Sequence, residues 1–240
     1  MHFLDLRRSN AVYIFRSIMD SPKTLSEISR ETEIAEITIK NIIYKLIDAS
    51  IVSRAKELNT SSVGRPKLYL APNPANHCVL IKKERSKYVF YSINTNGEQT
   101  ELFDFTTNYS LLNESGSLQM AFHNLKQLPI YENCHSVFLI GNEIEKVDVP
   151  NGVEKTTPFD LIVKSLIKEE RTIYVEYDGK KALLNYGKVK LVDISITDIE
   201  KIIDIDSKYI LNDLNLSSVL SEAIRIITLK NLEEKVAKLF

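Results

Sequence analysis

The first fifty residues contain three runs in which hydrophobic residues recur at helical spacing. The first run covers residues 11–19 and ends before the proline of "DSPK". The second begins at Thr24-Leu25-Ser26-Glu27, a capping-box pattern in which Thr24 and Glu27 satisfy each other's backbone amides. The third covers residues 36–48, with an apolar stripe made of Ile39, Ile42, Ile43, Leu46 and Ile47. A short turn joins the last two runs, so we expect a helix-turn-helix.

Two strand-like segments follow, residues 51–58 and 67–71, joined by "SSVGRP". Gly64 supplies conformational freedom at this turn, and Pro66 favours an extended Arg65. A hairpin directly after a helix-turn-helix is typical of a winged helix. Residues 1–75 are therefore predicted to form a winged helix-turn-helix domain that uses helix 36–48 and wing 51–71.

Residues 76–240 alternate strand and helix patterns. "NHCVLIKKERSKYVFYSINTNGEQTELFDF" predicts consecutive strands, "LQMAFHNLKQL" a helix and "SVFLIG" a buried strand. "DISITDIEKIIDIDSKYILNDLNL" predicts a half-buried strand and a short helix, and "SSVLSEAIRIITLKNLEEKVAKLF" predicts a terminal helix. That helix either packs on its own domain or pairs with a second copy of the chain.

Composition indicates a soluble globular protein of one to two domains. The 240 residues are 44% hydrophobic and 26% charged. No apolar run approaches the ~20 residues that span a bilayer, and "MHFLDLRRSN" lacks the apolar segment of a signal peptide. Two cysteines are too few for a disulfide framework. We expect a cytoplasmic protein with no membrane partner.

Charge is unevenly distributed along the chain. Residues 1–85 hold 14 Lys and Arg against 9 Asp and Glu, whereas residues 86–240 hold 17 against 23. A basic first third suits a polyanionic partner such as nucleic acid. A difference of this size also arises by chance, so it counts only together with the order of the motifs.

The candidate DNA-contacting residues come from the first helix, the third helix and the wing. Asn41 suits adenine, because its side chain offers a paired donor and acceptor. An extended Arg65 suits a narrow A·T-rich minor groove, and the other cations suit phosphates. The predicted set is Arg7, Arg8, Glu36, Thr38, Lys40, Asn41, Lys45, Lys56, Arg65 and Lys67. Ala35 stands where a Ser, Thr or Asp N-cap is expected before the third helix.

Three stretches of this first third resemble a known family. "RRSNAVYIFRSI", "LSEISRETEIAEITIKNIIYKLIDASIV" and "VGRPKLYLAPNP" are similar to the N-terminal region of ROK-family transcriptional repressors. The match falls on an Arg-x-x-Asn helix that includes Arg7 or Arg8 and Asn10, on Leu46, on Gly64-Arg65-Pro66 and on Asn73-Pro74. The resemblance implies operator binding, usually as a dimer or higher oligomer, and a sugar-binding second domain of the actin and ribonuclease H type.

The remaining chain departs from that second domain at the positions that matter for catalysis. "IKKERSK" stands where the related kinases carry an Asp-x-Gly-x-Thr phosphate loop. Asp178 falls on the kinases' catalytic aspartate, but Tyr177 replaces the preceding asparagine, and the following helix would begin at Gly179. Only about 60 residues follow Asp178. We therefore expect the second lobe of the kinase fold to be missing and Asp178 to be structural.

Two pairs of residues suggest zinc, His77-Cys78 and Cys134-His135. Their neighbours alternate as in strands, which places adjacent side chains on opposite faces. The Cys-x-Cys-Gly cluster that holds zinc in ROK proteins does not occur in the sequence. A buried cysteine beside a partly exposed histidine is the simpler interpretation, and we expect neither metal nor cofactor.

The sequence thus predicts an α+β fold, a winged helix-turn-helix domain at residues 1–75 and a truncated actin/ribonuclease H-like α/β domain at residues 76–240. The predicted function is that of a non-enzymatic, ROK-like transcriptional regulator that binds double-stranded DNA, for which we expect a homodimer; repression, as in the family it resembles, and activation both stay open. A small molecule or protein effector is a further partner class. Two alternatives stay open: a divergent sugar kinase or sugar-binding protein that retains Asp178, and a winged helix that binds protein.

Overall fold

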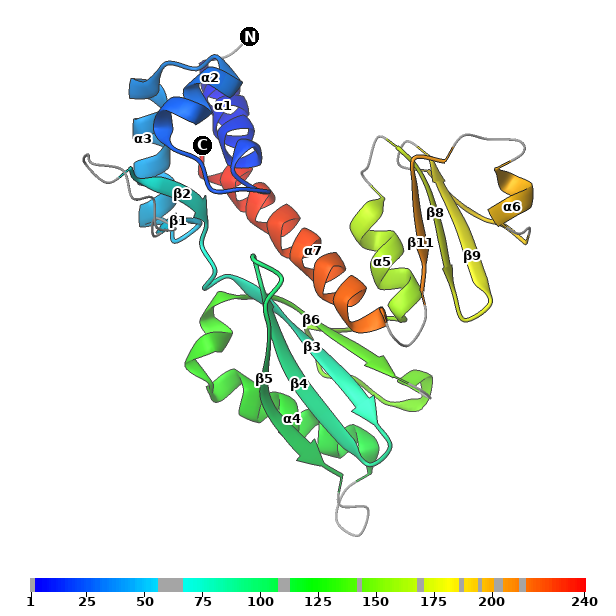
Figure 1. Cartoon of the computed structure of the whole chain (residues 1–240). Helices are drawn as coiled ribbons and strands as arrows, with labels where there is room; N and C mark the ends of the chain where they lie inside the picture. The colour runs from blue at the N-terminus through cyan, green and yellow to red at the C-terminus, as the bar shows by residue number, and fades with distance from the viewer. Residues whose placement is uncertain are drawn as a thin grey trace. The chain divides into compact units, whose positions relative to one another are not determined.

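The computed structural model describes residues 3–55, 67–107, 113–141, 144–167, 171–185, 188–193, 196–200, 205–211 and 215–240. The chain forms two compact units: an N-terminal unit of residues 1–76 and 228–240, and a β-rich unit of residues 77–227. Helices and three β-sheets make the fold a mixed α+β structure, as predicted (Figure 1). None of the helices in the described part of the chain is both long and apolar enough for a membrane span.

Three helices and two short strands form the first segment of the N-terminal unit. They are α1 (Phe3–Ser17), α2 (Leu25–Thr32), α3 (Glu36–Asp48), β1 (Val52–Ala55) and β2 (Tyr69–Pro72). The two strands pair antiparallel, and an isolated bridge joins Lys23 to Leu70 beside them. The predicted helices and strand pair are confirmed (Figure 1). Residues 56–66, with the predicted contacts Lys56 and Arg65, lie outside the described residues.

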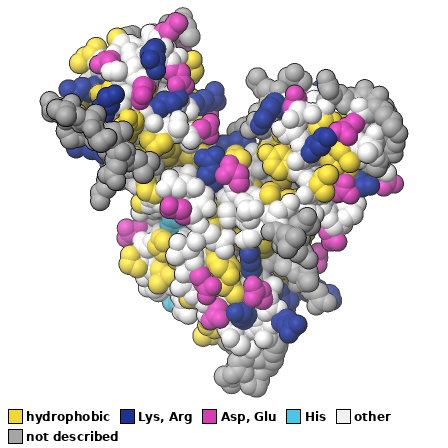
Figure 2. Space-filling view, in the orientation of Figure 1, with side chains coloured by type: hydrophobic (Ala, Val, Ile, Leu, Met, Phe, Trp, Pro, Cys, Tyr) yellow, Lys and Arg dark blue, Asp and Glu magenta, His cyan; other side chains and the backbone are white. Residues whose placement is uncertain are grey.

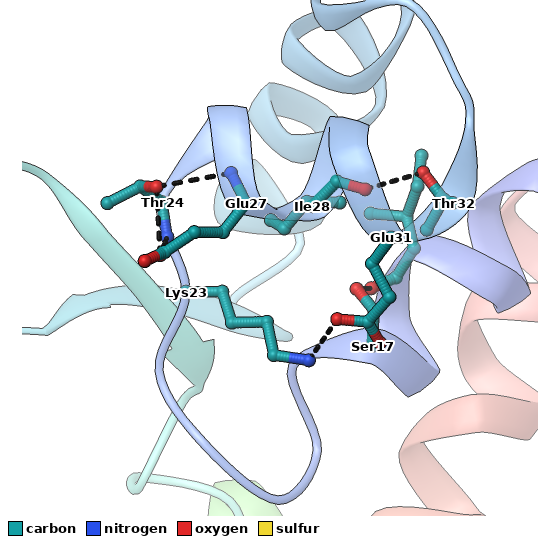
Figure 3. Close-up of polar contacts among 8 residues, drawn as sticks. Ser17, Lys23, Thr24, Glu27, Ile28, Glu31 and Thr32 are labelled. Carbon is teal, nitrogen blue, oxygen red and sulfur yellow. Dashed lines mark hydrogen bonds and ion pairs between the residues drawn. The ribbon is translucent and has the colours of Figure 1, made fainter.

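Helix α2 begins with the predicted capping box (Figure 3). The Thr24 hydroxyl oxygen accepts from the Glu27 amide at 3.3 Å, and a Glu27 carboxylate oxygen accepts from the Thr24 amide at 2.8 Å. These contacts hold the Glu27 carboxylate in its charged form, and so they lower its pKa. Lys23 also forms an ion pair with Glu31 on this helix. Helix α2 is therefore fixed at its start by side chains.

Helix α3 begins differently. Its N-cap is Ala35, which has only a methyl side chain and makes no side-chain capping hydrogen bond. Its buried face consists of the predicted residues Ile39, Ile42, Ile43 and Leu46. Tertiary packing rather than capping thus holds this helix in place.

The end of the long helix α7 (Leu216–Leu239) completes the core of the N-terminal unit. Leu229, Leu232 and Val236 are buried in one cluster with residues of α1, α2, α3 and β2. Arg16 of α1 donates to Glu233 of this helix at 2.7 Å. The sequence left open whether the terminal helix packs on its own chain, and these three residues do so. The predicted boundary at residue 75 leaves this second segment out.

The β-rich unit contains a five-stranded sheet in the order β5-β4-β3-β6-β7. Its strands are β3 (His77–Glu84), β4 (Lys87–Asn94), β5 (Gln99–Thr106), β6 (Cys134–Gly141) and β7 (Val153–Lys155). Strands β3, β4 and β5 pair antiparallel, whereas β3, β6 and β7 pair parallel. Helix α4 (Glu114–Gln127) packs on one face, and short 3-10 turns lie at Pro129–Asn133 and Ile144–Lys146.

A second sheet contradicts the expectation that the second lobe is missing. It consists of β8 (Thr172–Tyr177), β9 (Lys180–Asn185), β10 (Lys188–Leu191) and β11 (Ser207–Ile210), in the order β10-β9-β8-β11. Strands β8, β9 and β10 pair antiparallel and β8 pairs parallel with β11. This order repeats the first four strands of the first sheet. The expectation failed because short strands can form a reduced lobe within about 60 residues.

Helix α5 (Pro158–Leu166) and the start of α7 pack between the two sheets in one hydrophobic cluster. Alternate residues of β3 serve the two faces of the first sheet: Val79 and Ile81 join the cluster around α4, whereas Cys78 and Leu80 join the cluster around α5. The short helix α6 (Ile196–Ile199) lies next to the second sheet. The strand and short helix predicted for residues 193–216 are present as α6 and β11.

Asp178 does not occupy the place that the resemblance implied. It lies in the two-residue turn between β8 and β9, with φ of 49° followed by 74° at Gly179. Positive φ at both positions is typical of a tight hairpin turn, which Asp-Gly favours. A strand follows it, not a helix. The alignment with the kinases' catalytic aspartate is therefore wrong at this position.

Candidate nucleic-acid interface

Helices α1 and α3 border a surface hollow of about 320 Å³ in the N-terminal unit. Its lining residues are Leu6, Arg7, Asn10, Thr38, Asn41 and Ile42. Three of them, Arg7, Thr38 and Asn41, belong to the predicted DNA-contacting set. Asn10 comes from the Arg-x-x-Asn motif of the first helix, so the structure brings this motif next to the outer face of α3. The hollow thereby gathers one guanidinium, two amides and one hydroxyl, all of which can donate hydrogen bonds.

The exposed face of α3 carries two apolar residues that are not in the predicted DNA-contacting set. Ile37 is 65% exposed and Tyr44 is 47% exposed. With Asn41 they follow the i, i+4, i+7 spacing of one helix face. The signal was present in the sequence, because Ile37 lies outside the apolar stripe that faces the core. A single exposed isoleucine is ordinary, but one aligned with Asn41 suits a contact surface.

Aromatic rings accompany three of the predicted cations. The Lys40 ammonium lies 5.7 Å from the centroid of the Tyr44 ring. The Arg7 guanidinium carbon and the Lys45 ammonium each lie 5.4 Å from the centroid of the Phe240 ring. These distances are in the range of cation–π attraction. Phe240 directly follows α7 and is not among the residues predicted to contact DNA.

The other predicted residues have less structural support. Arg8 and Lys67 are exposed, and Lys67 lies close enough to Glu27 that its charge helps to lower the pKa of that carboxyl. Glu36 is the first residue of α3, where a carboxylate favours the helix dipole. That placement explains Glu36 without any DNA contact. Figure 2 shows Lys and Arg side chains on the N-terminal unit, with carboxylates among them.

The β-rich unit has a hollow of its own, with a volume of about 540 Å³. The end of β3 contributes Lys82 and Lys83, and the β8–β9 hairpin contributes Tyr177, Asp178 and Lys180. Lys83 is mostly buried and forms a 2.9 Å ion pair with Glu114. The segment that replaces the kinases' phosphate loop thus lines this hollow with charged side chains.

The two His/Cys pairs lie on neighbouring strands, because β3 and β6 pair parallel with His77 opposite Cys134. Both His77 and Cys78 are buried, so the expectation of a partly exposed histidine is wrong for His77. Burial raises the pKa of the Cys134 thiol to about 12, and the neighbouring Cys78 adds to the shift. Among the described residues, no group of three or more His, Cys, Asp or Glu is placed to hold a metal ion.

Comparisons with known proteins give remote structural similarities. No protein-family model matches the chain, and no curated protein matches it. It is similar to the crystal structure of a ROK family transcriptional regulator, a homologue of the E. coli Mlc protein, with 16% identity, a TM-score of 0.47 and coverage of 77% of this chain. The chain spans 56% of that regulator's length.

Two further solved structures show weaker similarity. One is a Bacteroides thetaiotaomicron protein with an actin-like ATPase fold and unknown function, with 9% identity and a TM-score of 0.27 over 63% of this chain and 89% of that one. The other is the Aquifex aeolicus Ppx/GppA phosphatase, with 15% identity and a TM-score of 0.27 over 52% of this chain and 55% of that one. Similarities this remote assign neither a family nor an activity, which must come from the residues of the chain itself.

Proposed function

We propose that the N-terminal unit is a winged-helix DNA-binding domain and that the protein is a transcriptional regulator. One observation carries the proposal: the hollow between α1 and α3 joins Arg7 and Asn10 to Thr38 and Asn41 beside an exposed helix face. The order of helix, short helix, longer helix and strand pair is that of a winged helix. In that arrangement α3 enters the major groove.

Each residue of the hollow suits one kind of contact. Asn41 can pair with the N6 and N7 atoms of adenine, and Thr38 can bond to several bases. Arg7 and Lys45 suit phosphates, which orient a protein without reading sequence. Arg8 and Lys67 are exposed and extend the proposed surface. Lys56 and Arg65 remain contacts proposed from the sequence alone, with Arg65 assigned to the minor groove. We assign Glu36 to the helix terminus rather than to DNA.

The test is a binding titration of the full chain against an A·T-rich duplex taken from upstream of its own gene. Fluorescence anisotropy at about 50 to 200 mM salt should give a linear fall of log affinity with log salt. Arg7→Ala should reduce that slope by about 1, whereas Asn41→Ala should weaken binding about tenfold, in line with the roughly 1–3 kcal/mol of a paired adenine contact.

Matched controls come from α4 of the β-rich unit, where Asn124 and Lys126 are exposed. Asn124→Ala and Lys126→Ala should leave binding unchanged. A wild-type chain that binds no duplex at low salt would favour the protein-interaction alternative. Equal binding by the wild type and the Arg7→Ala/Asn41→Ala double variant would refute the site.

We further propose that the regulator binds as a homodimer, since two linked domains that engage two half-sites gain affinity without new contacts. Sedimentation of the chain alone and with a duplex tests this, and a 1:1 complex on a palindromic site would contradict it. Whether the regulator represses or activates follows from reporter expression in cells that lack the gene.

A second candidate function concerns the hollow of the β-rich unit. Asp178 and three lysines line it, so it can take a polar small molecule such as a sugar or a phosphorylated sugar. We propose an effector site without chemistry, because the β3–β4 hairpin carries charged side chains instead of a glycine phosphate loop. Thermal melts with sugars, sugar phosphates and ATP–Mg²⁺ test it. Phosphate transfer from ATP to any of these sugars would establish the sugar-kinase alternative instead.

A further inference from the structure

The ring of Phe240 is close to two cations that belong to different helices. It is half-buried, and its side chain packs against the core of the N-terminal unit. The same ring lies 5.4 Å from the guanidinium carbon of Arg7 on α1 and 5.4 Å from the ammonium of Lys45 on α3. The residues that precede it, Leu232 and Val236, are buried and fix the end of α7 in this unit. The position of the Phe240 ring is therefore fixed by the packing of helix α7.

We infer that Phe240 is a positioning residue for DNA binding: its ring orients Arg7 and Lys45 toward the phosphate backbone. The inference rests on the proposed function of the N-terminal unit. It assigns a role in DNA binding to a residue near the opposite end of the sequence from the helices that contact DNA.

The physical reason is pre-organisation of flexible cations. Long Arg and Lys side chains lose rotamer freedom when they bind a phosphate, and that loss weakens binding. A ring that already holds both groups removes part of the loss before DNA arrives. Attraction to the negative face of the ring also favours a positive charge at each of these two positions.

The ring does not compete with phosphate for these groups. Cation–π attraction uses the charge of the cation and occupies none of its hydrogen-bond donors. Arg7 keeps the five N–H donors of its guanidinium, and Lys45 keeps the three of its ammonium. Both side chains can therefore donate to phosphate oxygens while they remain against the ring.

Phe240→Leu is the decisive variant, because leucine keeps apolar bulk and removes the aromatic face. On the same A·T-rich duplex we expect about fourfold to 25-fold weaker binding, from roughly two- to fivefold for each cation that must be ordered on binding. The thermal melt should change little. Phe240→Tyr and Phe240→Trp retain a ring and should restore binding, which a role in core packing alone would not predict.

A double-mutant cycle separates positioning from packing. In a chain that already carries Arg7→Ala and Lys45→Ala, Phe240→Leu should cause no further loss of affinity. A further loss there, or wild-type affinity of Phe240→Leu in the otherwise unchanged chain, would overturn the inference while leaving the proposed DNA binding intact. If the wild-type chain fails to bind the duplex at low salt, the proposed function fails, and this inference fails with it.

Discussion

Helices α2 and α3 are adjacent in the sequence but are stabilised in different ways. The start of α2 has the reciprocal bonds of Thr24 and Glu27. The start of α3 has Ala35, without a side-chain cap, and Ile37 follows it at 65% exposure. Both helices pack isoleucines into the same core. The difference is therefore confined to their outer surfaces and first turns.

The start and outer face of α3 contribute less to the stability of the N-terminal unit than those of α2. A capping residue is worth about 1 kcal/mol, and an exposed isoleucine contributes little to folding. Local rules of this kind are most often broken at functional sites. Helix α2 follows them and α3 does not, which agrees with α3 as the contact helix.

The largest expected difference comes from the same deletion made on each helix. Ile28→Ala on α2 removes a fully buried side chain and should lower the free energy of unfolding by about 2–5 kcal/mol. Ile37→Ala on α3 should change it by less than about 0.5 kcal/mol. Native-state hydrogen exchange of peptides from residues 3–55 measures both in the full chain. A large loss with Ile37→Ala would show that this residue is structural.

A smaller difference in stability is expected from substitutions at the N-cap positions of the two helices. Thr24→Ala should destabilise the N-terminal unit by about 1 kcal/mol, whereas Ala35→Ser should stabilise it by a similar amount, because serine can accept from the first turn of α3. Native-state hydrogen exchange of peptides from residues 3–55 measures both changes in stability. Ser26→Ala, at an exposed position inside α2, is the matched control and should have almost no effect. A loss of stability with Ala35→Ser would contradict this expectation. It would show that the amides at the start of α3 are already satisfied by groups other than the side chain of residue 35.

The stability that the Thr24–Glu27 capping box contributes depends on pH, and the direction of this dependence is set by the pKa of Glu27. Hydrogen bonds from Thr24 lower the pKa of Glu27 below its ordinary value of 4.5. A lowered pKa in the folded state stabilises the fold above pH 4.5, and this contribution is lost as the pH falls through the lowered pKa. The stability gap between the wild type and Thr24→Ala should therefore narrow from pH 7 to about pH 3.

The smallest expected effect concerns base reading by Ile37. An exposed isoleucine beside Asn41 suits the methyl group of thymine. A duplex made with deoxyuridine in place of thymidine should bind the wild type about two- to fourfold more weakly, the value of one buried methyl. Ile37→Ala should bind both duplexes equally.

Met120→Ala changes another exposed apolar side chain, on α4, and should keep the preference for thymine. An unchanged preference in Ile37→Ala would instead place the methyl contact on another residue. Weaker binding of both duplexes by the same factor would indicate a loss of general surface contact.

Local signals predicted the N-terminal unit well. The Thr24 to Glu27 box and the isoleucine stripe of α3 depend on residues three or four apart, so the sequence shows them directly. The assignment of Arg7, Thr38 and Asn41 to DNA contact also rests on local signals, and it stays a prediction. Ile37 was not selected, although the sequence already places it outside the apolar stripe of α3, because a single isoleucine off the stripe is ordinary and its alignment with Asn41 on one helix face was not considered.

Long-range pairing was not predictable in the same way. Strands β8 and β11 pair in parallel, and the Thr172 amide donates to the Asp206 carboxylate at 2.7 Å, although these residues are distant in sequence. Asp178-Gly179 between two alternating runs was a hairpin signal, but the resemblance to kinases suggested a helix there instead. Phe240 could not be predicted, because its partners Arg7 and Lys45 lie almost the whole chain away.

The two-segment core of the N-terminal unit also affects how the chain folds during synthesis. Domains generally fold in the order in which they leave the ribosome. Here the isoleucines of α1, α2 and α3 are made before the β-rich unit, but Leu229, Leu232 and Val236, which cover them, are made after it. At roughly 5–20 residues per second, translation of the β-rich unit keeps that core open for about 8–30 s. The core of the N-terminal unit is thus completed only after the whole β-rich unit has been translated.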